Sequence, residues 1–131
     1  MSKITSLQNR RRRITNQIHR LQSRLTRERK KEASINKNIG RLNKSIQRTK
    51  NINTLRRRQR EIERESKKYY RNNEKQAEIS SKISKLQEDL SKVSNEIDNY
   101  QIEEQKRLLQ KQHQKVKKLS PINLESRESI K

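Results

Sequence analysis

The 131-residue sequence contains no cysteine, tryptophan or phenylalanine, and only one glycine, one proline and three tyrosines. Without cysteine, the chain forms no disulfide and no thiolate metal site. The single glycine, Gly40, rules out a glycine-rich phosphate-binding loop. Apolar residues make up 25% of the chain, which is too few for an ordinary globular core. The composition therefore leaves two classes of protein, a disordered chain and a coiled coil.

Long apolar runs are also absent. The longest one, Leu108-Leu109, has two residues, so we expect no membrane-spanning helix and no signal peptide. A chain without cysteine also suits a reducing compartment, and we expect a cytoplasmic protein.

The apolar residues that are present follow the spacing of three and four residues that is typical of a coiled coil. They form two mirror-image series in which the paired residue numbers sum to 104: Ile4 with Tyr100, Leu7 with Ile97, Ile14 with Leu90, Ile18 with Leu86, Leu21 with Ile83, Leu25 with Ile79, Ile35 with Tyr69, and Leu42 with Ile62. A constant sum is what two antiparallel helices require. The fold class that follows is all-α, a long antiparallel helical hairpin.

The predicted hairpin occupies residues 1–119, with a helix over 3–50, a turn at 50–54 and a second helix over 54–118. Asn51, Asn53 and Thr54 favour the turn because their side chains bond to nearby backbone groups. The same mirror symmetry also fits long single helices in an antiparallel dimer centred on Ile52, and this alternative stays open.

The pattern weakens at one height of the hairpin. The second helix shows two successive steps of three at Asn73, Gln76 and Ile79, opposite a polar stretch near Glu28 and Glu32. Such a stammer overwinds a coiled coil locally, so we expect a soft zone there.

The second helix is expected to outlast the first, because residues 104–119 have no mirror partners. Its unpaired apolar residues are the candidates for self-association or for docking a neighbouring protein or domain: Leu108, Leu109, Val116 and Leu119. Ser120-Pro121 should stop the helix and leave residues 120–131 as a polar linker or tail.

The net charge of +21 is concentrated in the first arm. Residues 1–60 carry 20 Lys/Arg and 2 Glu, whereas residues 61–131 carry 16 Lys/Arg and 13 Asp/Glu. Basic side chains on a rigid helix can neutralise nucleic-acid phosphates without reading sequence. The candidate phosphate contacts are Arg10, Arg11, Arg12, Arg13, Arg56, Arg57, Arg58 and Arg60.

The titratable residues show no catalytic or metal-binding pattern. His19 and His113 lack neighbours that would complete a metal site. A two-helix coil also lacks the burial that separates the pKa values of a catalytic carboxylate pair. We therefore expect no enzyme activity in these residues, no cofactor and no metal.

The helical stretch, its stop at Leu119-Ser120-Pro121 and the tail Asn123-Leu124-Glu125-Ser126 resemble the N-terminal coiled-coil region of bacterial TIR-domain proteins in their layout. That resemblance implies a following flavodoxin-like domain that hydrolyses NAD, with the coil controlling its assembly. No catalytic residue of such a domain falls within this sequence. The two hypotheses are a coiled-coil oligomerisation module and a basic nucleic-acid-binding protein.

Overall fold

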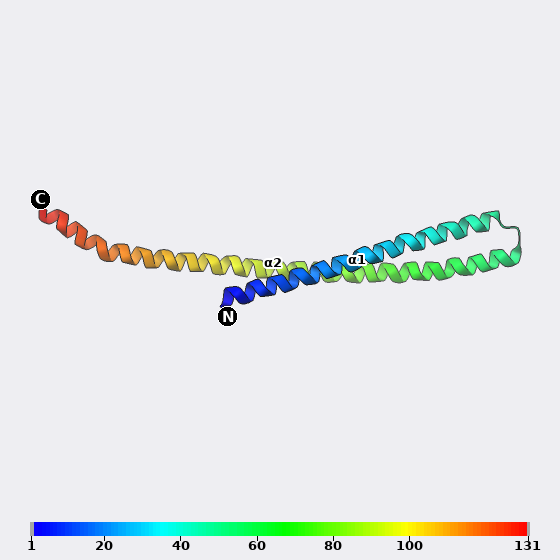
Figure 1. The fold of residues 1–131 in the computed structure, drawn as a ribbon, viewed down its shortest axis with the longest axis horizontal. Helices are drawn as coiled ribbons and strands as arrows, with labels where there is room; N and C mark the ends of the chain where they lie inside the picture. The colour runs from blue at the N-terminus through cyan, green and yellow to red at the C-terminus, as the bar shows by residue number, and fades with distance from the viewer. Residues whose placement is uncertain (1, 131) are drawn as a thin grey trace. The chain divides into compact units, whose positions relative to one another are not determined.

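The computed structural model describes residues 2–130, and the side chains of residues 2–117. It contains two helices, α1 (Lys3–Arg48) and α2 (Ile52–Ile130) (Figure 1). They pack against each other as an antiparallel helical hairpin, so the predicted fold class is confirmed. Ser2 caps the start of α1, where its side-chain Oγ accepts a hydrogen bond of 3.2 Å from the Thr5 amide.

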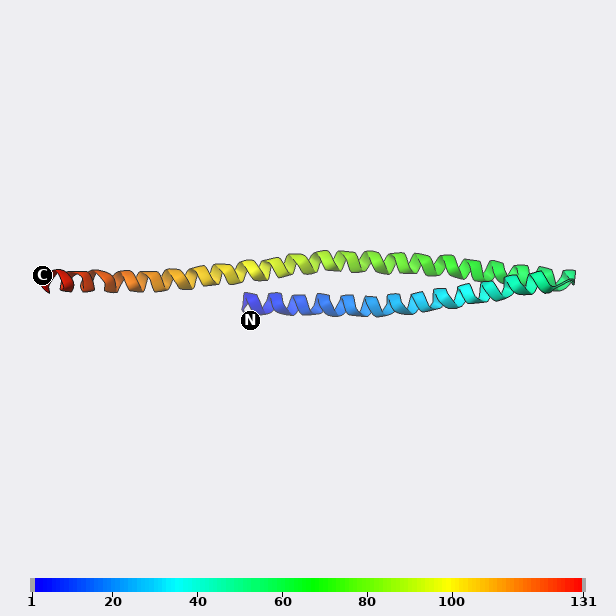
Figure 2. The ribbon, with the colours of Figure 1, turned by 90° about the horizontal axis from the view of Figure 1, so that it is seen from above.

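The chain divides into two units, each described by itself. Residues 12–90 form the first unit, in which α1 and α2 run side by side and are joined by the connection over residues 49–51 (Figures 1 and 2). Residues 1–11 and 91–131 form the second unit, in which the first two turns of α1 lie along α2. Each unit thus contains a section of both helices.

The connection is shorter than the predicted turn at 50–54, because Asn51 caps α2. The Asn51 Oδ1 accepts hydrogen bonds from the amides of Asn53, at 2.9 Å, and Thr54, at 3.4 Å. These amides belong to the first turn of α2, where no backbone carbonyl is available to them. The side chains expected to favour a turn do so by starting the helix, and α2 begins two residues before the predicted Thr54.

The seam of each helix is an unbroken series of alternating three- and four-residue steps. In α1 it runs Ile4, Leu7, Arg11, Ile14, Ile18, Leu21, Leu25, Glu28, Glu32, Ile35, Ile39, Leu42 and Ile46, and Thr49 continues it in the connection. In α2 it runs Leu55, Arg58, Ile62, Glu65, Tyr69, Asn72, Gln76, Ile79, Ile83, Leu86, Leu90, Val93, Ile97 and Tyr100. Every one of these residues except Arg11 is buried or half-buried. The regular alternation is the heptad pattern of a coiled coil.

The predicted stammer at Asn73 is wrong. Asn72, which is only 4% exposed, fills the seam between Tyr69 and Gln76, so the steps there are three and four. Asn73 is half-buried beside the seam. The polarity of Asn72 concealed it in a pattern built from apolar residues alone.

Burial is deepest at the seam positions far from the connection. Leu25 and Ile79 are 9% and 3% exposed in the first unit, and Val93 and Ile97 are 1% and 2% exposed in the second. Fully burying one such aliphatic side chain contributes roughly 1.5–3 kcal/mol. The hairpin is therefore held mainly by these aliphatic layers.

The structure differs from the predicted helix stop at Ser120-Pro121, because α2 continues through them to Ile130. Proline lacks an N–H and so removes one backbone hydrogen bond of the helix. Residues with good helix propensity, including Lys117 and Leu124, lie on both sides of it. Residues 120–130 are thus helical rather than a separate linker.

Candidate interaction surfaces

The part of α2 that follows Tyr100 exposes large apolar side chains. Leu108, Leu109 and Val116 are 58%, 63% and 60% exposed. Ile102, which the sequence analysis missed, is 49% exposed. The side chain of Leu119, the fourth predicted residue of this surface, lies outside the described ones. We call Ile102, Leu108, Leu109 and Val116 the apolar line.

The apolar line has a coiled-coil spacing of its own. Ile102, Leu109 and Val116 are each seven residues apart, and Leu108 adjoins the middle one. At about 100° of rotation per residue, this line lies about 120° around α2 from the seam that faces α1. The residues that would pair with a further helix are therefore not those that hold the hairpin together. The seven-residue step from Ile102 is the sequence signal that identifies it.

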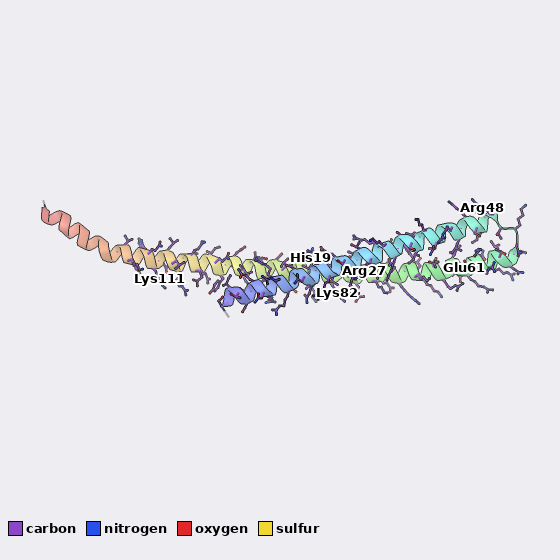
Figure 3. All side chains as sticks on the ribbon, viewed as in Figure 1. His19, Arg27, Arg48, Glu61, Lys82 and Lys111 are labelled. Atoms are coloured by element: carbon purple, nitrogen blue, oxygen red, sulfur yellow. The ribbon has the colours of Figure 1, made fainter. Side chains whose placement is uncertain are left out.

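The charges around the apolar line are mixed. Arg107 forms an ion pair of 2.7 Å with Glu104 on the same helix. Glu103 is exposed, as are Lys111, Lys115 and Lys117 further along α2. Figure 3 shows Lys111 on this part of α2. The acidic residues thus precede these lysines along the helix, so the surface is more negative at its start and more positive at its end.

The predicted phosphate contacts do not form one site. Arg10, Arg12 and Arg13 are exposed, but consecutive residues point in different directions around a helix. Arg58 is half-buried in the seam, where its guanidinium donates to the Ser45 Oγ at 3.2 Å and pairs with Glu61 at 3.2 Å. These ionic groups are next to the connection, where Figure 3 labels Arg48 and Glu61.

Within the first unit, Arg12 and Arg13 lie far from the second predicted arginine cluster, Arg56–Arg60. Ser45, the partner of Arg58, is 32 residues along α1 from Arg13. At a rise of 1.5 Å per residue, that separation is about 48 Å. The structure therefore does not bring Arg12 and Arg13 together with Arg56–Arg60 in this unit.

A hydrogen-bonded polar layer occupies the predicted soft zone. The Asn72 amide donates to the Glu28 backbone carbonyl and to the Glu28 carboxylate, both at 2.8 Å. The Gln76 amide donates to the Glu32 carboxylate and to the Asn72 Oδ1, both at 2.5 Å. Gln76 thus lies opposite Glu32, and Glu28 bonds Asn72 rather than the predicted Asn73, so the layer joins the two polar stretches by specific bonds.

The described residues contain no group of three or more His, Asp or Glu side chains that could hold a metal ion. His19 and His113 are both exposed on the helix surface. In the described part of the chain, neither helix has a segment whose length and hydropathy suit a membrane crossing.

Comparison with known proteins gives no relative. No family model, no curated protein and no solved structure matches the chain. The resemblance to the coiled-coil region of TIR-domain proteins therefore stays a prediction.

Proposed function

We propose that this protein is a non-enzymatic coiled-coil module that self-associates through the apolar line of α2. The observation that carries the proposal is the exposure of four large aliphatic side chains on one stretch of helix that α1 does not cover. Large apolar side chains that gather at the surface favour protein association.

A second copy of the same segment is the partner that the spacing favours. The heptad that begins at Ile102 and Gln105 continues with Leu109 and Gln112. A heptad repeat is satisfied by another helix with the same repeat. In an antiparallel arrangement, Leu109 of one copy lies at the height of Gln112 of the other copy. Each residue of the apolar line then lies within one helical turn of a residue of the same heptad pattern in the other copy.

The order of charges favours the antiparallel orientation. In that orientation, Glu103 and Glu104 of one copy lie at the height of Lys117 of the other, and the contact occurs twice by symmetry. A parallel pair would instead place the lysines of the two copies side by side. Exposed ion pairs each contribute only about 0–1 kcal/mol, so charge selects the orientation while apolar burial supplies the affinity.

The expected affinity is modest. Burying the exposed part of each aliphatic side chain contributes about 1–2 kcal/mol. Association has to overcome the lost freedom of two molecules, which costs an estimated 4–15 kcal/mol. We therefore expect a dimer whose population depends on concentration, suited to gathering copies of an attached domain.

A spin-label distance tests both the association and its orientation. The chain has no native cysteine, so Gln101→Cys provides a single labelling position at the start of the surface. The antiparallel pair places residue 101 opposite residue 120, so the two labels should lie about 28 Å apart along the helix axis. The same label in a Leu108→Gln, Leu109→Gln chain is the matched control and should show no defined distance.

Two results would refute the proposal. A label separation close to the interhelical distance of about 8–10 Å would show a parallel pair. The absence of any intermolecular distance at high protein concentration would show that the apolar line does not mediate self-association.

A further inference from the structure

A stripe of basic side chains runs along one flank of α2 in the first unit. Its members recur at three- and four-residue steps and are all exposed: Arg57, Arg60, Arg64, Lys68, Arg71 and Lys75. At about 100° per residue they fall within a sector about 80° wide, so they share one face of the helix. The stripe is about 27 Å long, since 18 residues separate its ends.

The stripe is specific to one flank. The row at the same spacing on the other flank of α2 contains no basic residue at all: Gln59, Glu63, Ser66, Tyr70, Asn73 and Ala77. A solvated face that only keeps the coil soluble would not require this difference. The charge is thus directed to one side of the hairpin.

The cations of the stripe are largely uncompensated. Among the described residues, only Lys68 of the six forms an ion pair, with Glu65 at 3.2 Å. Glu61 pairs with Arg58 and Glu65 pairs with Lys68, and in the described part of the chain neither Glu63 nor Glu74 forms an ion pair with a stripe residue. Five cations therefore remain available to an external anion.

A groove between the two helices extends the positive surface. One section of about 570 Å³ is lined by residues that include Arg41 of α1 with Arg64 and Lys68 of α2. A neighbouring section of about 430 Å³ is lined by residues that include Lys68, Arg71 and Lys75. Because Lys68 lines both sections, the groove follows the stripe, and cations of both helices flank it. Glu28, Glu61 and Glu65 also line the groove, but each section has four basic residues against two acidic ones, so its net charge is positive.

We propose that this stripe and groove bind the phosphate backbone of a double-stranded nucleic acid without reading its sequence. Regularly spaced cations on a rigid helix match a polymer that carries one negative charge per about 1.7 Å of its axis. Four of the five uncompensated stripe cations, Arg57, Arg60, Arg64 and Arg71, carry guanidinium groups, as does Arg41 in the groove. Guanidinium groups bond phosphate oxygens in a fork geometry.

The aromatic residues favour a duplex over a single strand. Sequence-tolerant binding of single strands uses aromatic side chains on which unpaired bases stack. Here Tyr69 is half-buried in the seam, and Tyr70 lies on the flank that has no basic residue. The groove therefore offers charge but no stacking platform.

The test compares two triple variants of the full chain for binding to a 20-base-pair duplex. The first, Arg64→Gln, Arg71→Gln and Lys75→Gln, removes three cations of the stripe. The second, Arg29→Gln, Arg56→Gln and Lys67→Gln, removes the same number and types of charge from exposed positions outside the stripe and groove. Glutamine is close to arginine and lysine in helix propensity, and circular dichroism checks that both variants fold.

If each removed group contacts a phosphate, the slope of log K against log salt should fall in magnitude by about 2.7 in the stripe variant. Its affinity at about 0.1 M salt should fall by about tenfold or more, while the second variant should lose less than about threefold. Equal losses in both variants would overturn the proposal, because they would show a diffuse electrostatic field. Equally effective competition by polyglutamate, at the same charge concentration, would overturn the assignment to nucleic acid.

Discussion

Replacing Asn72 with alanine should destabilise the hairpin far more than an ordinary polar substitution in a coiled coil. The change removes the hydrogen bonds to the Glu28 carbonyl and carboxylate and the one accepted from Gln76. Bonds to charged groups contribute roughly 1.5–3 kcal/mol and neutral ones about 0.5–1.5 kcal/mol. Because Asn72 is 4% exposed and the Glu28 side chain 13% exposed, water replaces these bonds poorly.

The expected loss is therefore about 2–5 kcal/mol, after subtracting the gain of about 0.5 kcal/mol from the higher helix propensity of alanine. Urea unfolding followed by circular dichroism at 222 nm measures it, with the slope m checked for constancy. Asn73→Ala is the matched control, because it makes the same chemical change one residue away at a half-buried position. That variant should change the unfolding free energy by less than about 0.5 kcal/mol.

Equal stability of the two variants would refute the reasoning. It would mean that the bonds of the polar layer contribute nothing beyond what water supplies. A loss of stability in Asn73→Ala alone would instead show that Asn73 occupies the seam, as the apolar pattern predicted.

Four further variants test the rest of the fold. Asn51→Ala removes the cap of α2 and should cost about 1 kcal/mol in the same unfolding assay, whereas an unchanged midpoint would exclude a role for the cap. Ile97→Ala should cost about 2–5 kcal/mol because Ile97 is 2% exposed. Ile102→Ala, at a dilution where copies do not pair, should cost less than about 0.5 kcal/mol, and similar losses at both positions would contradict the assigned seam. A chain with Leu7→Cys and Ile97→Cys should form a disulfide within one chain on oxidation, whereas covalent dimers on a non-reducing gel would indicate two long helices that exchange arms.

Most of the fold follows from periodicity, which the sequence displays directly. The burial of Leu7, Leu25, Ile79 and Ile97 was predictable because apolar spacing fixes which face of each helix turns toward the other helix. Asn72 was not predictable from the same pattern, since its place in the seam depends on a carboxylate of the other helix. The helix stop predicted at Pro121 was wrong because the outcome depends on two opposing free energies, the cost of the proline and the helix propensity of its neighbours. The sequence alone does not show which of the two is larger.

The surfaces were predictable only in part. Leu108, Leu109 and Val116 stand out because they follow the last mirror-paired residue, but Ile102 does not, as it lies within one turn of Tyr100. Runs such as Arg10–Arg13 are easily recognised in the sequence, but consecutive side chains point in different directions around a helix and do not share one face. The stripe from Arg57 to Lys75 required reading charge at helical spacing, which sequence reasoning can do once the helix is known.

Sedimentation equilibrium tests self-association through the apolar line most directly. The chain is compared at about 0.1 M and about 1 M salt with two variants, Leu108→Gln with Leu109→Gln, and Ile52→Gln. Ile52 is the matched control because it is 65% exposed, close to the 63% of Leu109, and lies outside the apolar line. The predicted result is a dimer that persists at high salt. The Ile52→Gln variant should keep this dimer, and the Leu108→Gln, Leu109→Gln variant should be a monomer. A monomer at every concentration, or a dimer that survives the loss of both leucines, would contradict it.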